Sequence, residues 1–294
     1  MKARQSNWPG DPSRRSSRTT RSPVPPAVLL LRRILRWNAP DAEGLRGRIN
    51  TVIRAYLRWN RHLRLDPWMR YRPVVSAIAT VVPDQDARVL DVGSGSVGLA
   101  HFLGRSVVGV DVEFTDRDWE QVPSRLVPVR GSATHLPFRD ESFDAVVSMD
   151  TLEHIPRAGR PQAVAELFRV GRRLVVLGFP FGEASSRFDG AALLEERGQG
   201  VVLGWRDEHV RYRLPGQELH HEIVAAVQRR RPEMALSWFP QEGLRGLRLR
   251  WKLQLLIRKE SRLYGLLFYP LYWLTVRGKP KRAYRRIYIA TKQR

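Results

Sequence analysis

Apolar and polar positions alternate in short blocks over the second and third quarters of the chain. Mainly apolar runs of this kind are typical of strands in a parallel sheet that is covered on both faces. They lie at 89–92, 107–110, 126–129, 145–149 and 174–179. Helical spacing predicts helices at 97–103, 162–170 and 215–231, so strands and helices alternate. Two later runs, 234–240 and 285–292, predict further strands with a long helical insertion between them.

The N-terminal part follows different patterns, which predicts a division of the chain. Residues 1–26 are rich in Arg, Ser and Pro without an apolar period, which indicates a disordered basic tail. Such a start is also typical of an organellar transit peptide. Residues 27–66 have apolar positions at helical spacing and predict amphipathic helices. The main domain is then expected at 67–294, with two insertions at about 181–214 and 243–280.

The charge of the chain is unevenly distributed. The 294 residues carry a formal charge of +22, and there is no cysteine, which excludes disulfides, thiolate zinc sites and cysteine nucleophiles. Residues 1–65 hold 15 Lys and Arg against 3 Asp and Glu, and residues 243–294 hold 15 against 1. The middle is slightly acidic. We therefore expect the two basic ends to meet any anionic partner, although an arginine-rich surface could also serve solvation alone.

A glycine-rich loop follows the first predicted strand. Residues 93–98 read Gly-Ser-Gly-Ser-Val-Gly, a pattern that permits a tight turn and close approach of backbone N–H groups to a ligand. Asp111 ends the next predicted strand, where its carboxylate can accept hydrogen bonds from ribose hydroxyls. This much fits NAD, FAD or S-adenosylmethionine. Asp91, two residues before Gly93, would repel a pyrophosphate but suits a ligand with a cationic ammonium and sulfonium.

Three spaced motifs follow the loop in order: "LPF" at 136–138, "SFD" at 142–144 and "LEH" at 152–154. With them, the chain resembles the class I S-adenosylmethionine-dependent methyltransferases, in particular their small-molecule branch. The resemblance implies an α/β fold with a Rossmann-like, doubly wound, seven-stranded sheet whose last strand is antiparallel. It also implies a helical insertion before that strand, and S-adenosylmethionine as cofactor at the carboxyl ends of the strands.

The resemblance also assigns cofactor-binding residues. Asp91 and the loop 93–95 would face the methionine part, Asp111 the ribose hydroxyls, and Val112 the adenine. Many relatives have an aspartate where this chain has Ser132, whose hydroxyl can accept the adenine hydrogen bond more weakly. Both Ser132 and its neighbour Thr134 could instead be ordinary turn residues. The full expected set is Asp91, Gly93, Ser94, Gly95, Asp111, Val112, Ser132, Ala133, Thr134 and Asp150, the last near the methionine end and the acceptor.

Two histidines are candidates for the general base that an oxygen acceptor would need. His154 stands in "LEHIP" at the mouth of the expected site, and His209 stands in the insertion after the fifth strand, where class I enzymes often build their acceptor pocket. His220 and His221 fall inside a predicted helix, which favours a packing role. The sequence has no metal-ligand spacing, so we predict that no metal takes part.

The C-terminal arm suggests where the acceptor is found. Residues 263–276 are uncharged, aromatic and too short to span a bilayer, with Arg and Lys on both sides. This composition suits a membrane interface, and equally a buried lid over an acceptor pocket. We therefore expect a cytoplasmic methyltransferase, peripheral at the inner face of the membrane, acting on a small, lipid-linked or glycan acceptor. The alternatives are an RNA methyltransferase and a non-catalytic scaffold that binds S-adenosylmethionine.

Overall fold

The structure is a computed structural model that describes residues 65–96, 98–114, 125–200, 203–256, 280 and 282–292. All of them belong to Arg46–Arg294, the second of two compact units of the chain. The predicted basic tail, nearly all of the predicted N-terminal helices and the aromatic run 263–276 lie outside the described residues. The boundaries at 26 and 66 therefore stay predictions.

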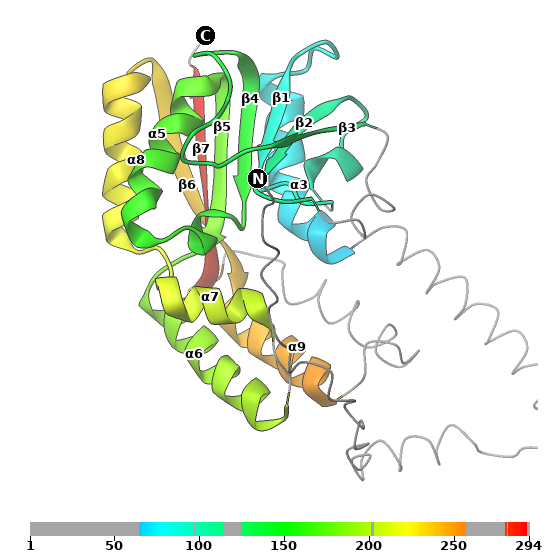
Figure 1. Cartoon of the computed structure of the whole chain (residues 1–294), viewed down its shortest axis with the longest axis vertical. Helices are drawn as coiled ribbons and strands as arrows, with labels where there is room; N and C mark the ends of the chain where they lie inside the picture. Colours follow the sequence, from blue (N-terminus) through cyan, green and yellow to red (C-terminus); the bar gives the residue numbers. More distant parts are fainter. Residues whose placement is uncertain are drawn as a thin grey trace, which may run out of the picture. The chain divides into compact units, whose positions relative to one another are not determined.

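A seven-stranded sheet forms the centre of the fold, with the strand order β3-β2-β1-β4-β5-β7-β6 (Figure 1). The strands β1 to β5 run parallel to one another, and β7 is antiparallel to both β5 and β6. This confirms the predicted Rossmann-like sheet with an antiparallel last strand. The strands are β1 (Val89–Val92), β2 (Val107–Asp111), β3 (Leu126–Arg130), β4 (Phe143–Met149), β5 (Gly171–Pro180), β6 (Met234–Gly243) and β7 (Ala283–Lys292).

The central strands are mainly apolar because both faces of the sheet are covered. Every residue of β1 and β4 is buried. Successive side chains of a strand point to opposite faces. Accordingly Leu90 packs in one core cluster and its neighbour Val89 in the other. Burying one such aliphatic side chain stabilises the fold by about 1.5–3 kcal/mol, which is why no polar alternation is visible in these runs.

Helices cover the two faces and one end of the sheet (Figure 1). Two of them, α5 and α8, contribute to the core cluster of Leu90, and α3 contributes to the cluster of Val89. The helices with described residues are α3 (Leu65–Val81), α5 (Arg160–Val170), α6 (Glu183–Gly198), α7 (Gly204–Tyr212), α8 (Gln217–Arg230) and α9 (Leu244–Leu256). None of the helices in the described ranges is long and apolar enough to cross a membrane.

One predicted helix is wrong. Instead of a helix over 97–103, the chain forms only a short 3₁₀ turn, η1 (Leu99–His101). The amide of Leu99 donates to the Asp91 carboxylate at 2.7 Å. The Asp91 side chain, eight residues earlier, thus accepts the hydrogen bond from the first amide of the turn. Gly98 and Gly104, on either side of the turn, also disfavour a longer helix.

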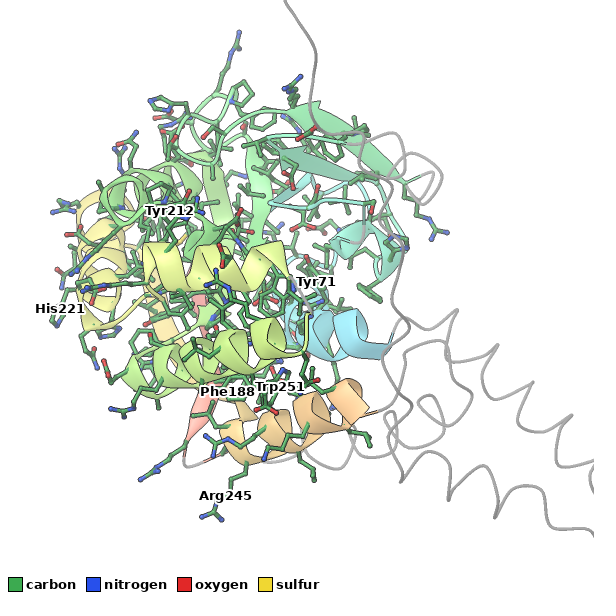
Figure 2. The ribbon with its side chains drawn as sticks, turned by 60° about the horizontal axis from the view of Figure 1, so that its bottom comes forward. Tyr71, Phe188, Tyr212, His221, Arg245 and Trp251 are labelled. Atoms are coloured by element: carbon green, nitrogen blue, oxygen red, sulfur yellow. The ribbon has the colours of Figure 1, made fainter. Side chains whose placement is uncertain are left out.

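The insertion after β5 is helical and follows the carboxyl end of that strand. It contains α6 and α7, and α6 packs against α9, the helix that follows β6. Figure 2 shows Phe188 of α6 and Trp251 of α9 facing each other, with ring centroids 5.9 Å apart. Two further 3₁₀ turns, η2 (Leu152–His154) and η3 (Arg157–Gly159), connect β4 to α5. The turn η2 contacts α7, so the insertion reaches the end of β4.

Candidate active site

The glycine loop after β1 has the tight geometry that its sequence predicts. Gly93 and Gly95 have φ angles of +77° and +46°, in the left-handed region that favours glycine. The amide of Gly93 donates to the Val110 carbonyl at 2.7 Å. A Cβ on Gly93 would lie 2.0 Å from Oγ1 of Thr151. The loop is therefore fixed between the carboxyl ends of β2 and β4.

Asp111 joins the glycine loop to the end of β2. Its Oδ2 accepts a hydrogen bond from the Gly95 amide at 2.9 Å, and its Oδ1 accepts one from the Val112 amide at 2.8 Å. A carboxylate oxygen can accept more than one hydrogen bond, so both retain capacity for ribose hydroxyls. The Val112 side chain is 64% exposed beside them. A carboxylate that can bind ribose hydroxyls, next to an exposed apolar side chain that can pack on a base, fits a nucleoside.

Asp91 lies directly beneath the loop and is fully buried. Burial raises the pKa of its carboxyl to about 7; the hydrogen bond from Leu99 lowers the pKa, and the nearby charge of Asp111 raises it. A Cβ on Gly98 would lie 2.4 Å from Asp91 Oδ2, so that glycine allows the close approach. A buried acid of this kind favours a cationic group over a pyrophosphate.

The remaining expected cofactor contacts lie in the loop itself and after β3. Ser94 is buried, and its hydroxyl lies against Gly109 of β2, so its expected contact with the cofactor stays a prediction. The Ser132 and Thr134 hydroxyls lie 2.8 Å apart on either side of the buried Ala133. They bond to each other as turn residues do, and their contact with adenine stays a prediction.

Asp150, at the end of β4, is held by two arginines. Its Oδ2 accepts from Arg70 at 2.7 Å, and Arg285 donates to both carboxylate oxygens at 2.7 and 3.0 Å. Although burial opposes ionisation, the Arg285 and Arg70 guanidiniums outweigh it and hold the pKa of Asp150 at about 2. A positive φ of 54° marks its constrained position. The predicted cofactor contact of Asp150 stays a prediction.

His154 and His209 come together although they lie far apart in the sequence. His154 ends η2, His209 lies in α7, and their ring centroids are 4.9 Å apart. Each ring has a carboxylate at Nδ1: Glu208 Oε2 at 2.6 Å from His154 and Asp189 Oδ2 at 2.8 Å from His209. Burial lowers the pKa of His154, and Glu208 partly opposes this. The structure thus brings both predicted candidates to one place, and their catalytic role stays a prediction.

Glu153 belongs to the same group, and the sequence reasoning missed it. It is fully buried, and its Oε1 lies 3.9 Å from Nε2 of His209. Burial raises the pKa of Glu153 well above its usual range, with a further contribution from Asp150. Glu153 was visible in the "LEH" motif, but only the fold shows that its carboxylate faces His209. The prediction that no metal takes part rested on spacing alone, and spacing does not reveal this group.

A buried ionic network fixes His209 from behind. Asp189, which holds the ring, also accepts from Arg206 at 2.8 Å and from the Tyr284 hydroxyl at 2.8 Å. Arg206 in turn donates to Glu196 at 2.9 Å. All members are at least nine-tenths buried. Because such charges are stable in the interior only when they are paired, the network holds α6, α7 and β7 in register around the ring.

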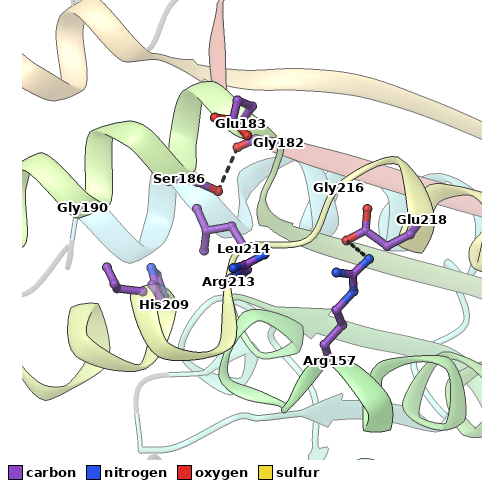
Figure 3. A pocket seen from close by; sticks show the side chains of 11 residues that line it. Arg157, Gly182, Glu183, Ser186, Gly190, His209, Arg213, Leu214, Gly216 and Glu218 are labelled. Carbon is purple, nitrogen blue, oxygen red and sulfur yellow. Dashed lines mark hydrogen bonds and ion pairs between the residues drawn. The ribbon is translucent and has the colours of Figure 1, made fainter.

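Next to His209 is a cavity of about 380 Å³. Figure 3 shows His209 at one end and Arg157 near the other, where it forms an ion pair with Glu218 at 3.8 Å. The lining of the cavity combines charged side chains of both signs with small and apolar residues. The lining residues are Arg157, Gly182, Glu183, Ser186, Gly190, His209, Val210, Arg213, Leu214, Gly216 and Glu218. The cavity lies in the insertion after β5, where the sequence predicts the acceptor pocket.

Comparison with known proteins places the core of this fold in a family. Residues 90–177 match a family model described as a methyltransferase domain. A demethylmenaquinone methyltransferase of Lactiplantibacillus plantarum is 30% identical over 151 residues, which cover 46% of this chain and 62% of the relative. An uncharacterised protein of Haemophilus influenzae is 34% identical over 97 residues, which cover 29% of this chain and 39% of that protein. The chain thus spans less than two thirds of either relative.

A solved structure from Thermotoga maritima is also similar. It is described as an S-adenosylmethionine-dependent methyltransferase, possibly a histamine N-methyltransferase, with 16% identity and a TM-score of 0.48. The alignment covers 82% of this chain and 96% of that one. The segment 90–177, with the glycine loop, Asp111 and His154, matches the methyltransferase domain family. This confirms the resemblance, and the domain family implies S-adenosylmethionine as the cofactor.

Proposed function

We propose that this chain binds S-adenosylmethionine across Gly93–Gly95 and transfers its methyl group to a small, lipid-linked or glycan acceptor at a membrane surface. The observation that carries the cofactor assignment is the Asp111 carboxylate, which the Gly95 amide fixes at the loop. The buried acid of Asp91 supports the same ligand. When bound, the cofactor supplies an electrophilic methyl group on a sulfonium.

The residues of the chain then have separate tasks. Asp91 compensates the positive charge at the methionine end, Asp111 accepts the ribose hydroxyls, and Val112 covers one face of the adenine. In-line transfer requires that the acceptor atom, the methyl group and the sulfur be aligned. We place the acceptor in the cavity beside His209. The His209 ring lies 4.9 Å from the ring of His154, in the turn η2 that follows Thr151, and Thr151 packs against Gly93 of the cofactor loop.

Two features favour an amphipathic acceptor. The cavity lining combines charged side chains with Val210 and Leu214, so it can take a polar head and an apolar body. The relative from Lactiplantibacillus plantarum has a name that gives demethylmenaquinone, a quinone, as its acceptor. Neither feature suits the long basic groove that the phosphates of a nucleic acid need. We therefore prefer an amphipathic small molecule to RNA.

Helix α9 supports contact with an anionic membrane. It exposes Arg245, Arg248 and Lys252, and Leu249 between them is 52% exposed. Figure 2 shows Arg245 pointing away from the fold, whereas Trp251 points toward α6. One face of α9 packs against the fold, and its opposite face presents basic side chains with an apolar residue among them. Such a face suits the headgroup layer of an anionic membrane.

The cofactor assignment is tested by calorimetric titration of the full chain with S-adenosylmethionine. Asp111→Asn removes the charge and changes the acceptor capacity at the ribose, so we expect at least a 10-fold weaker Kd. Asp86→Asn, an exposed acid before β1, is the matched control and should bind as the unaltered chain does. No binding by the unaltered chain, or equal binding by Asp111→Asn, would reject the assignment.

The acceptor class is tested with methyl-labelled cofactor and separate lipid, RNA and polar extracts. We expect label in the lipid or polar fraction. Label in the RNA fraction alone would show the RNA methyltransferase that the sequence leaves as an alternative. Cofactor binding without label in any fraction would point to the non-catalytic scaffold.

A further inference from the structure

Three side chains next to the proposed methyl-transfer site have the composition of a metal centre. Glu153, His154 and His209 each offer one ligand atom, and these atoms lie within 4.8 Å of one another. Ligand atoms on a divalent ion at about 2.1 Å lie about 3.0–4.2 Å from each other. The 3.9 Å between Glu153 Oε1 and His209 Nε2 is already in this range. Small side-chain rotations would bring the third ligand in.

The orphaned atoms of this group show that something is missing from it. Both carboxylate oxygens of Glu153 and Nε2 of His209 are buried without a hydrogen-bond partner among the described residues. An unsatisfied buried polar group costs about 1–3 kcal/mol, and more when it is charged. Three such atoms on two neighbouring side chains are difficult to explain as packing. A bound cation would satisfy all of them at once.

The outer contacts of both histidines are those of metal ligands. Nδ1 of His154 faces Glu208, and Nδ1 of His209 faces Asp189. Such a carboxylate fixes the proton on Nδ1 and leaves Nε2 as the ligand, an arrangement found at most histidine-metal bonds. His154 is 29% exposed, so one side of the group remains open for entry and for an exchangeable ligand. We propose that Glu153, His154 and His209 bind a divalent first-row transition-metal ion.

The donor set selects the kind of metal. Two imidazoles and one carboxylate suit Zn²⁺, Co²⁺, Mn²⁺ or Fe²⁺ better than Mg²⁺ or Ca²⁺, which prefer oxygen ligands only. Three protein ligands on a four- to six-coordinate ion leave one or more positions open. This is the composition of a catalytic site, not of a closed structural one.

The role of the ion rests on the proposed function. Thr151, two residues before Glu153, contacts Gly93 of the cofactor loop, so the open position lies near the sulfonium end. A hydroxyl acceptor in that position would lose its proton to water more readily. Its oxygen then forms the bond to the methyl carbon while the methyl–sulfur bond breaks, and the electron pair stays on sulfur as a neutral thioether.

The site can be tested without activity. Tag-free full chain, which has no cysteine and only 7 histidines, is titrated with Co²⁺ and followed by its visible absorption, with Zn²⁺ as competitor. We expect one ion per chain. Glu153→Gln keeps the shape of the side chain and should weaken Co²⁺ binding by about 100-fold, as should His154→Ala, which changes a partly exposed residue.

His221→Ala is the matched control, because His220 and His221 are adjacent in α8 and could bind metal adventitiously. It should leave the Co²⁺ spectrum and stoichiometry unchanged. Absence of stoichiometric binding, or equal binding by a folded Glu153→Gln variant, would overturn the proposal. Calorimetry with S-adenosylmethionine separates the two proposals: a chain that binds Co²⁺ but no cofactor contradicts only the proposed function, and the converse contradicts only the metal site.

Discussion

Glu153 Oε1 and His209 Nε2 lie 3.9 Å apart in the interior, and neither has a hydrogen-bond partner in the described part of the chain. The two residues reach this position from different elements, the turn after β4 and helix α7. The proposed acceptor cavity lies beside this pair, since His209 contributes to its lining. The methyltransferase core and the insertion after β5 therefore meet at one chemical group.

The buried carboxylate that holds His209 should contribute far more to the free energy of unfolding than the exposed carboxylate that holds His154. Asp189→Asn removes a charge that pairs with Arg206 and accepts from His209 and Tyr284, all buried. We expect it to lower the free energy of unfolding by about 3 kcal/mol, because Arg206 loses one of its two carboxylates. Urea unfolding measures this.

Glu208→Gln is the matched variant, since Glu208 is 47% exposed and holds the other histidine. An exposed ion pair contributes about 0–1 kcal/mol, so its effect on unfolding should stay below about 1 kcal/mol. Equal destabilisation by the two variants would contradict the role given to the buried network.

Asp91 should make stability depend on pH. Its folded pKa of about 7 lies above the ordinary value of 3.8, so the folded chain holds a proton that the unfolded chain releases between these values. The contribution to stability is fully present below about pH 4 and is lost as the pH rises through about 7. At pH 8, Asp91→Asn should be more stable than the unaltered chain by up to about 4 kcal/mol. Urea unfolding at pH 4.5 and pH 8 checks this, and the gain should shrink strongly at the lower pH.

The Asp91 carboxyl should also make cofactor binding depend on pH. A cationic cofactor favours ionised Asp91, so S-adenosylmethionine should bind more tightly as the pH rises from 6 to 8, with release of a proton. Calorimetry in buffers of different ionisation enthalpy counts that proton. Asp91→Asn should bind more weakly with no such proton release; the same proton count in both proteins would contradict the assignment.

The two loop glycines should differ in their tolerance of a side chain. Both have positive φ, which costs an alanine about 1–2 kcal/mol. At Gly93 the added Cβ would also meet Thr151 at 2.0 Å, whereas nothing lies within 4 Å at Gly95. Gly93→Ala should therefore abolish cofactor binding and lower the thermal midpoint much more than Gly95→Ala. Similar midpoints for both variants would show that the packing against Thr151 is not needed.

The sequence predicted those elements of the fold that depend on a local pattern of apolar residues. The mainly apolar runs at 89–92 and 145–149 form strands whose residues are all buried, as a sheet covered on both faces requires. The helix at 97–103 failed because Asp91 takes the amide of Leu99, a contact that no periodicity encodes.

The candidate site was predicted in the same uneven way. Asp111 and the glycines follow from a short motif, because their contacts are close in the chain. Glu153 with His209, and Asp150 with Arg70 and Arg285, join residues that only the strand order brings together. Sequence reasoning could name His154 and His209 separately, but it could not show that their rings lie 4.9 Å apart.

Helix α9 should determine how strongly the chain binds anionic vesicles. Each basic residue near an anionic surface contributes about 1 kcal/mol, and salt screens the attraction. Reversal of the three exposed cations Arg245, Arg248 and Lys252 to Glu should therefore lower binding to phosphatidylglycerol vesicles by 100-fold or more. Flotation of the full chain at low salt measures this. The control reverses Arg139, Arg229 and Arg230, which are exposed on other elements and change the net charge equally. If both triple variants lose binding to the same extent, the attraction comes from overall charge, and α9 is not the membrane-facing element.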